Sequence, residues 1–360
     1  MDPAVSLILG TRPEIIKMAP IVRELDRRGI PFQLIHTGQH YSDTLDTVFF
    51  RTLDLPTPDY NLEAGSGTHA EQTAAMLTGV DEILLETQPN VVLVQGDTNS
   101  VLAGGLAASK REMELGHVEA GLRSFDREMP EEVNRRLVDH AADYLFPPTT
   151  TARDQLLKED LPEDRVYMTG NTVVDAVEEH GTLAETRSDV LEEYDVAAGK
   201  YALLTAHRAE NVDDANRFEK ILDGIQSFAS ETGLEIIYPV HPRAEERLND
   251  FGLSRPASIR FVEPLDYLDF LKLEQNAAVV FTDSGGVQEE TCILGTPCVT
   301  LRDNTERPET LDVDANRLAG TDPDQIRTDG LEMLEGKQTW SNPFGDGTAA
   351  EQIVEVIEPR

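Results

Sequence analysis

Short apolar runs rich in β-branched residues alternate with longer amphipathic stretches along the whole chain. In the first half, the runs that we predict to be strands are residues 5–10, 31–37, 91–96, 115–120, 143–148 and 166–170. This alternation is typical of βαβ units, in which helices connect parallel strands and cover the sheet. The pattern therefore predicts an α/β fold built on parallel, doubly wound sheets.

The same pattern starts again in the second half of the chain. Its predicted strands are residues 201–207, 234–240, 259–264, 277–283 and 296–302, and an acidic helical segment, 173–194, separates the two halves. We therefore expect two domains, 1–170 and 171–344, with a hinge near Gly170 and a last helix, about 345–360, that packs back onto the first domain. Ligands of such domains bind beyond the carboxyl ends of the strands, so we expect a site in an interdomain cleft.

The charge of the chain narrows the classes of partner. It has 360 residues, with 67 acidic and 31 basic side chains and a net charge of −36, which disfavours binding to nucleic acid or to an anionic membrane. Only seven of the basic residues are lysines, and the acidic excess is spread along the chain. We expect a halophilic protein, because molar salt screens self-repulsion within about 3 Å; an ordinary acidic cytosolic protein is the alternative.

Two further observations concern the compartment. No apolar run approaches the roughly 20 residues of a membrane span, and the first residues lack a basic leader, which predicts a soluble, cytoplasmic protein. Cys292 and Cys298 are too few for a disulfide scaffold and lack the partners of a zinc site. We interpret both as buried, reduced thiols.

Charged residues stand where the predicted strands end. Asp97 follows residues 91–96, Glu119 lies in the run 115–120, and His207 ends the run 201–207; Glu131 follows Pro130 at a predicted helix start. Open α/β sheets build active sites from such positions, so the sequence predicts an enzyme with these four candidate residues. No histidine has metal-ligand spacing, and we expect no metal.

The first predicted strand runs into the segment GTRPEIIK, residues 10–17. A helix that starts near Pro13, together with Arg12 and Lys17, would form an anion site suited to a phosphate or diphosphate. The alternative is that both cations only solvate the helix. The G-x-G-x-x-G motif of dinucleotide-binding proteins does not follow this strand.

A second predicted anion site follows the run 277–283. Ser284, Gly285 and Gly286 open a helix there, and the glycines allow close approach of a phosphate, whereas Glu290 suits the hydroxyl groups of a ribose. The alternative is a packed helix start without a ligand. Arg307, in the loop segment TERPET, either reaches a ligand or forms a surface ion pair.

Ten motifs occur in a fixed order: GTRPE-I-K-MAP, TGQH, GDTNS, HVEAGLRS, PEEVNR, TAHRAEN, YPVHPR, DSGGVQEE, TERPE and NPFGDG. This ordered set resembles the non-hydrolysing UDP-N-acetylglucosamine 2-epimerases from the first strand to the last helix. The resemblance implies two Rossmann-like domains of the glycosyltransferase-B type, a homodimer, and interconversion of UDP-GlcNAc and UDP-ManNAc without a cofactor.

The resemblance also implies a route and a set of roles. UDP leaves by elimination to give a 2-acetamidoglucal and then adds back, with the proton delivered to the opposite face of C2. Asp97, Glu119, Glu131 and His207 become the candidate acids and bases. The diphosphate is expected to contact Arg12, Lys17, Ser284, Gly285, Gly286 and Arg307, the uridine Phe270, and the ribose Glu290.

Other functions remain open from sequence. An epimerase of a modified sugar, such as a UDP-2,3-diacetamido-hexuronate, would have the same acid, base and diphosphate sites. A glycosyltransferase of the same fold would need an acceptor site, and a non-catalytic UDP-sugar sensor would not need the four candidate residues. Bacterial members have a second, activating UDP-GlcNAc site around Gln39, His40 and His241, but the run after GQH differs here, which leaves that regulation open.

Overall fold

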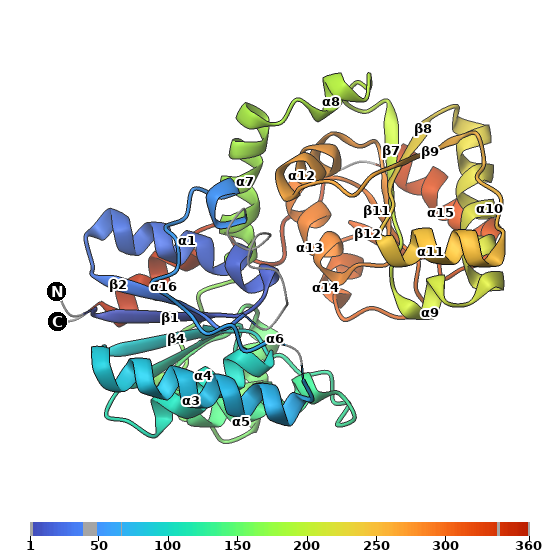
Figure 1. Ribbon diagram of the computed structural model, residues 1–360. Coiled ribbons are helices and arrows are strands. Elements are labelled where there is room, and N and C mark those ends of the chain that lie inside the picture. Colours follow the sequence, from blue (N-terminus) through green and yellow to red (C-terminus); the bar gives the residue numbers. More distant parts are fainter. Residues whose placement is uncertain (1–2, 39–48, 66, 337–338, 359–360) are drawn as a thin grey trace. The chain divides into compact units, whose positions relative to one another are not determined.

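The computed structural model describes residues 3–38, 49–65, 67–336 and 339–358. The chain folds into two compact units, each built around one six-stranded sheet (Figure 1). Unit 1 comprises Met1–Ala176 and Phe344–Arg360, and unit 2 comprises Val177–Pro343.

The sheet of unit 1 has the strand order β3-β2-β1-β4-β5-β6, and every pair is parallel. Its strands are β1 (Val5–Leu9), β2 (Phe32–His36), β3 (Tyr60–Asn61), β4 (Val91–Gln95), β5 (Glu114–Val118) and β6 (Tyr144–Phe146). The order reverses between β1 and β4, which is the switch point where doubly wound sheets bind their ligands. The residues that follow β4 lie at this switch point, and those that follow β5 lie one strand away.

Helices cover both faces of this sheet. They are α1 (Arg12–Arg28), α3 (His69–Thr87), α4 (Asn99–Ser109), α5 (Pro130–Ala141), α6 (Thr150–Lys158), the 3-10 helix η1 (Glu163–Arg165) and α16 (Ala349–Ile357). The last helix, α16, packs against α1 (Figure 1), and just beyond it Glu358 Oε2 accepts from Arg28 Nη1 at 3.0 Å. The C-terminal helix is thus part of unit 1.

Unit 2 repeats the topology with the order β12-β11-β10-β7-β8-β9, again all parallel. Its strands are β7 (Tyr201–Thr205), β8 (Glu235–Pro239), β9 (Ile259–Val262), β10 (Val280–Thr282), β11 (Cys298–Thr300) and β12 (Asn316–Leu318). Its helices are α8 (Val190–Glu193), α9 (Ala209–Val212), α10 (Ala215–Thr232), α11 (Pro242–Phe251), α12 (Tyr267–Asn276), α13 (Gly285–Leu294), α14 (Pro308–Asp312) and α15 (Pro323–Glu335), while α7 (Thr172–Arg187) leads into the unit.

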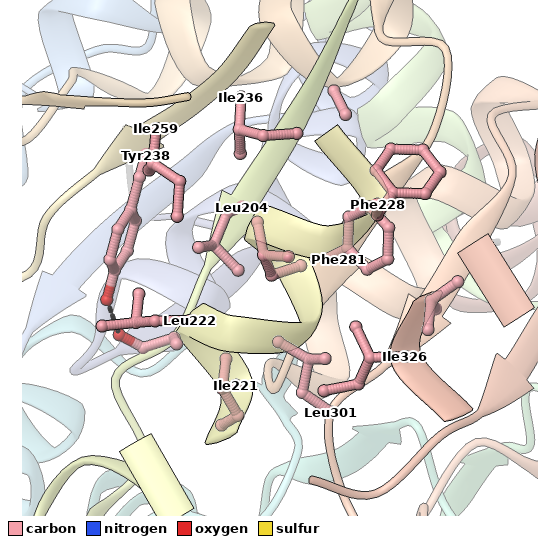
Figure 2. Packing of buried hydrophobic residues seen from close by; sticks show 14 of the residues in the cluster. Leu204, Ile221, Leu222, Phe228, Ile236, Tyr238, Ile259, Phe281, Leu301 and Ile326 are labelled. Carbon is pink, nitrogen blue, oxygen red and sulfur yellow. Dashed lines mark hydrogen bonds between the residues drawn. The ribbon is translucent and has the colours of Figure 1, made fainter. Parts of the chain in front are cut away.

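The core of unit 2 lies between its sheet and the helices α10 and α15. Phe228 and Phe281 meet edge to face, with ring centroids 5.0 Å apart, and Tyr238 donates a hydrogen bond to the carbonyl of Ala206 at 2.8 Å (Figure 2). Gly330 lets α15 approach closely, because a Cβ there would lie 2.7 Å from Phe281. Each large apolar side chain buried in this way contributes about 1.5–3 kcal/mol.

The predicted α/β class with two Rossmann-like, doubly wound sheets is confirmed, but three details of the sheets differ from the prediction. Residues 166–170 do not form a strand; only one bridge, between Leu145 and Val166, extends the edge before Gly170 turns the chain away with φ 85°. The short edge strands β3 and β12 were not predicted. Neither contains an apolar run, and an edge strand of two or three residues can pair through its backbone without one.

Candidate active site

Glu119 lies just beyond β5 in a strained backbone conformation. Its φ is +66°, a region that costs a residue with a Cβ about 1–2 kcal/mol and that is enriched at functional sites. Its carboxylate is buried, with Lys17 Nζ 2.6 Å away and a hydrogen bond from Gln95 Nε2. The structure therefore fixes Glu119 between a cation and an amide.

Asp97 lies just beyond β4, two residues after Gln95. Its carboxylate pairs with Arg135 of α5, and its backbone carbonyl accepts from Asn134 Nδ2 at 2.9 Å. Burial raises the pKa of Asp97 above its usual range, the charges of Glu119 and Glu131 raise it further, and Arg135 opposes them. The structure thus brings Glu119 and Glu131 within electrostatic reach of Asp97.

The neighbouring residues Glu131 and Glu132 have different surroundings at the start of α5. Glu132 is buried and accepts from the amide of Ser124 at 2.8 Å and from Arg136 Nε at 2.9 Å. Burial would raise the pKa of Glu132, but these hydrogen bonds lower it overall, so this residue is a fixed structural anion. Glu131 is half-buried, and its charge raises the pKa of Asp97.

The start of α1 differs from the predicted anion site. The carboxylate of Glu14 accepts from the amides of Gly10 at 2.5 Å and Thr11 at 3.2 Å, and from Thr98 Oγ1 at 2.5 Å. The chain's own carboxylate therefore occupies amides that we expected to bind phosphate, and Lys17 is engaged with Glu119. Burial raises the pKa of Glu14 to about 7.

Arg12 and Gly10 lie in the same segment as Glu14. Arg12, in the first turn of α1, is exposed. Gly10 is explained by packing, because a Cβ there would lie 1.9 Å from Ser100 Oγ. Of the predicted diphosphate contacts in unit 1, Arg12 is therefore the one whose position leaves it open to solvent.

In unit 2, Asp283 holds the turn that carries His207. The carboxylate of Asp283 is buried after β10 and accepts from the amides of His207 and Arg208 at 3.0 and 2.9 Å, and from Asn211 Nδ2 at 3.1 Å. Although burial acts in the opposite direction, these hydrogen bonds and His207 lower the pKa of Asp283. His207 Nδ1 lies 3.1 Å from Asp283 Oδ1, which fixes the orientation of the ring.

The start of α13 has room for a ligand. A Cβ on Gly285 or Gly286 would meet no heavy atom nearer than 3.9 Å, and neither residue has a left-handed φ. Ser284 is the N-cap residue, but its side chain makes no capping hydrogen bond. Packing and backbone conformation therefore do not require these glycines, whereas close approach of a ligand would.

Arg208 is a site residue that sequence reasoning missed. Its Nη2 would lie 3.9 Å from a Cβ on Gly285, so the guanidinium stands at the start of α13. Arg307, which we predicted to contact a diphosphate, has its Nε 2.7 Å from Glu289 Oε1 of α13. The signal for Arg208 was present in the motif TAHRAEN, where it directly follows His207.

The predicted uridine and ribose residues lie on the neighbouring helices α12 and α13. Phe270 of α12 is half-buried and packs on a hydrophobic cluster of unit 2 that includes Val287 of α13. Glu290 of α13 is also half-buried. Burial and the charges of Glu290 and Glu274 raise the pKa of Tyr267 well above its usual range. A carboxylate and an aromatic ring thus lie on adjacent helices.

Gln39 and His40, which by resemblance correspond to an activating site of bacterial relatives that we left open for this chain, lie outside the described residues. His241 is described: it caps α11, and its Nδ1 accepts from the amide of Arg243 at 3.1 Å. Burial lowers the pKa of His241.

Three further findings concern metals, membranes and thiols. Among the described residues, no group of three or more His, Cys, Asp or Glu side chains could hold a metal ion. Within the same residues, no helix has the length and apolar character needed to cross a membrane. Cys292 and Cys298 are buried free thiols, and burial raises the pKa of each to about 12.

Comparison with known proteins gives consistent results over the whole chain. The family model described as UDP-N-acetylglucosamine 2-epimerase matches residues 23–358. A UDP-N-acetylglucosamine 2-epimerase of Methanococcus maripaludis is 50% identical over 359 residues, which cover 98% of each chain. A UDP-2,3-diacetamido-2,3-dideoxy-D-glucuronate 2-epimerase of Pseudomonas aeruginosa is 36% identical over 355 residues, which cover 97% of this chain and 98% of that protein.

A solved structure is also similar. It is the UDP-GlcNAc 2-epimerase of Methanocaldococcus jannaschii in complex with UDP-GlcNAc and UDP, with a TM-score of 0.86 and 50% sequence identity, covering 98% of this chain and 99% of that one.

Proposed function

Because this chain belongs to the UDP-N-acetylglucosamine 2-epimerase family, we propose that it is an isomerase that interconverts UDP-GlcNAc and UDP-ManNAc. The observation that carries the proposal is the group of Asp97, Glu119 and Glu131 in unit 1, with Lys17 and Arg135 paired to two of them. Such a group supplies both an acid and a base in one place.

The reaction has to overcome the weak acidity of the C2–H bond beside an acetamido group. Breaking the C1–O bond first, or largely first, creates an oxocarbenium-like centre that acidifies C2–H. UDP then leaves with the bonding electrons, a base removes the proton from C2, and a 2-acetamidoglucal with a C1–C2 double bond is formed. Return of UDP to C1 and of a proton to the opposite face of C2 gives the epimer.

Inversion at C2 needs a proton acceptor on one face and a donor on the other. Asp97 has a raised pKa and can hold a proton nearer to neutrality, whereas the ammonium of Lys17 stabilises the charge of Glu119. Contrasting environments of this kind separate an acid from a base. We assign proton transfer to this pair, assisted by Glu131, and retain His207, oriented by Asp283, as the fourth catalytic candidate.

The same proposal assigns the departing UDP to residues of unit 2 and to Arg12. The helix amides after Ser284 and the guanidinium of Arg208 favour the negative charge that develops as the C1–O bond breaks. Lys17 is no longer assigned to the diphosphate, because its Nζ lies 2.6 Å from Glu119 Oε1 in an ion pair. The nucleotide contacts are then Arg12, Arg208, Ser284, Gly285, Gly286 and Arg307 for the diphosphate, Phe270 for uracil and Glu290 for ribose.

The setting of the enzyme is also part of the proposal. We expect it to act in the cytoplasm, at high salt and as a homodimer, as its charge and its resemblance to the family imply. Light scattering at molar KCl measures the mass directly. A monomer at enzyme concentrations that support full turnover would contradict the dimer.

A modified UDP-sugar is the second candidate substrate, because the Pseudomonas aeruginosa relative is a 2-epimerase of UDP-2,3-diacetamido-2,3-dideoxy-D-glucuronate. Proton NMR of UDP-GlcNAc incubated with the enzyme, without added metal or NAD, decides between them. Signals of UDP-ManNAc are expected. An unchanged UDP-GlcNAc spectrum, with turnover of the diacetamido-glucuronate, would assign the enzyme to the second substrate, and no turnover of either would favour a transferase or a sensor.

A further inference from the structure

We propose that His117 is a doubly protonated, positively charged imidazolium that positions Asp97 and Glu119. The charge state follows from the contacts of His117 alone, and the positioning role rests on the proposed function. The ring is fully buried within β5 and is not among the groups assigned to the substrate.

Both ring nitrogens of His117 face acceptors. Nδ1 lies 2.7 Å from Asp139 Oδ1 of α5, and Nε2 lies 2.8 Å from the carbonyl oxygen of Gly96. A carbonyl oxygen accepts only, and an ionised carboxylate accepts only. A neutral ring would direct a lone pair at one of these oxygens, whereas an imidazolium donates to both.

An alternative arrangement would place the second proton on Asp139 instead of on the ring. The other oxygen of that carboxylate, Oδ2, accepts from Arg123 Nη1 at 2.7 Å and from the amide of Gly121 at 3.2 Å. A carboxylate that already accepts from a guanidinium and an amide is stabilised as an anion. The proton therefore belongs on His117.

The charges of this buried group support the same assignment. Arg123 is held between Asp139 and Glu159, with Nη2 2.6 Å from Glu159 Oε2 and with 1% of its side chain exposed. With a neutral His117, one guanidinium would face two carboxylates. A charged His117 makes two cations and two anions, and buried charges are stable when they are paired and hydrogen-bonded in this way.

Other charged groups lie around this core. Arg136 Nη2 lies 3.6 Å from Glu159 Oε1, and Arg136 Nε also donates to Glu132 at 2.9 Å. Arg136 and the buried Glu132 thus add one cation and one anion to the group, so its charges still balance when His117 is charged.

His117 holds the turn that carries Asp97. Its Nε2 binds the carbonyl of Gly96, whose amide donates to the carbonyl of Val118 at 3.1 Å. Gly96 has a φ of +85°, and it connects Gln95, which contacts Glu119, with Asp97. The imidazolium thus fixes the turn that holds Asp97 directly and Glu119 through Gln95. Misplacement of a reacting group by about 1 Å costs roughly 10²-fold in rate.

Two variants separate the contacts of the ring. In His117→Gln the longer amide can still donate to Gly96, whereas in His117→Asn the shorter amide reaches Asp139 but not Gly96. We expect turnover to fall roughly 10²-fold in His117→Asn and less in His117→Gln, with the UDP dissociation constant unchanged in both because the nucleotide residues are elsewhere. His140→Gln, at an exposed histidine of α5, is the matched control.

NMR of protein labelled with ¹⁵N in histidine reads the charge state directly. The two nitrogens of an imidazolium have similar shifts, and those of a neutral ring are widely separated; the His117→Gln spectrum identifies the signal. A widely separated pair for His117 near neutral pH would overturn the charge assignment. Equal turnover of folded His117→Asn and wild type would overturn the positioning role, whereas an inactive wild type with an imidazolium signal would count against the proposed function alone.

Discussion

Alanine at Gly285 or Gly286 should separate folding from nucleotide binding. These residues begin α13, and a Cβ at either position would meet nothing nearer than 3.9 Å in the protein. The backbone has no left-handed φ at either residue. Neither packing nor backbone conformation requires glycine at these positions, whereas a ligand that approaches the helix amides would. The two substitutions therefore test the diphosphate site directly.

Alanine at these positions should raise the stability of the fold and lower the affinity for UDP. Replacing glycine by alanine where the backbone allows it stabilises a fold by about 0.4–1 kcal/mol, mainly by restricting the unfolded chain. The same methyl group would hold a phosphate away from the helix amides. Loss of one charge-assisted hydrogen bond costs about 1.5–3 kcal/mol, which corresponds to a roughly 10- to 150-fold higher UDP dissociation constant.

The assay uses the single tryptophan of the chain. Trp340 lies in unit 2, and its Nε1 donates to the carbonyl of Cys292 in α13 at 2.9 Å, so its fluorescence reports on this helix during urea unfolding. Isothermal titration calorimetry gives the UDP dissociation constant of the same samples.

Gly295→Ala is the matched control at the other end of α13. Gly295 also has no neighbour within 4 Å, but its φ is +77°, so alanine should destabilise unit 2 by about 1–2 kcal/mol and leave UDP binding unchanged. Unchanged UDP affinity in both Gly285→Ala and Gly286→Ala would refute the placement of the diphosphate at this helix.

Four further predictions concern unit 1 and the charge of the chain. Lys17→Met should destabilise unit 1 by about 3–5 kcal/mol, because it removes the ammonium that pairs with the buried Glu119, and adding Glu119→Gln should recover part of the loss. Hydrogen exchange of β4 and β5 measures both effects, and additive effects would exclude coupling between the two residues. The pKa of Glu14 rises from 4.5 to about 7 on folding, so the contribution of Glu14 to the unfolding free energy is complete below pH 4.5 and falls by roughly 3 kcal/mol as the pH rises through about 7. The unfolding free energy of Glu14→Gln should lack this change with pH, and identical pH profiles of the variant and the wild type would contradict the prediction. Asp97→Asn, Glu119→Gln and Glu131→Gln should each lower turnover by about 10² or more, and near-native rates in all three would remove their assignment. The unfolding free energy should rise with KCl because salt screens the charge of −36, and no rise between dilute and molar salt would remove the halophilic expectation.

The sequence was informative where short-range patterns decide the structure. Buried strands alternate with amphipathic helices, so the two parallel sheets and the positions of Asp97 and His207 after strands were predictable. The positions of edge strands were not, because β3 and β12 lack an apolar run.

The partners of long charged side chains could not be predicted either. Lys17 lies 102 residues before Glu119 and pairs with it, and Arg135 reaches Asp97 from α5. A motif shows that a cation is present, but the partner that it selects depends on which loops the sheet brings together. At the start of α1 the partner was local but was still missed: the carboxylate of Glu14, within the motif GTRPE, accepts from amides that we had assigned to a phosphate.

Elimination and return of UDP is the central claim, and one experiment tests it most directly. UDP-GlcNAc with ¹⁸O in the bridge between C1 and the diphosphate is incubated with the enzyme in D2O, and the product is analysed by NMR. The account predicts UDP-ManNAc with deuterium at C2 and with ¹⁸O moved partly from the bridge into non-bridging positions of the β-phosphate. UDP-ManNAc that keeps its C2 protium and all of its bridging ¹⁸O would contradict cleavage of the C1–O bond.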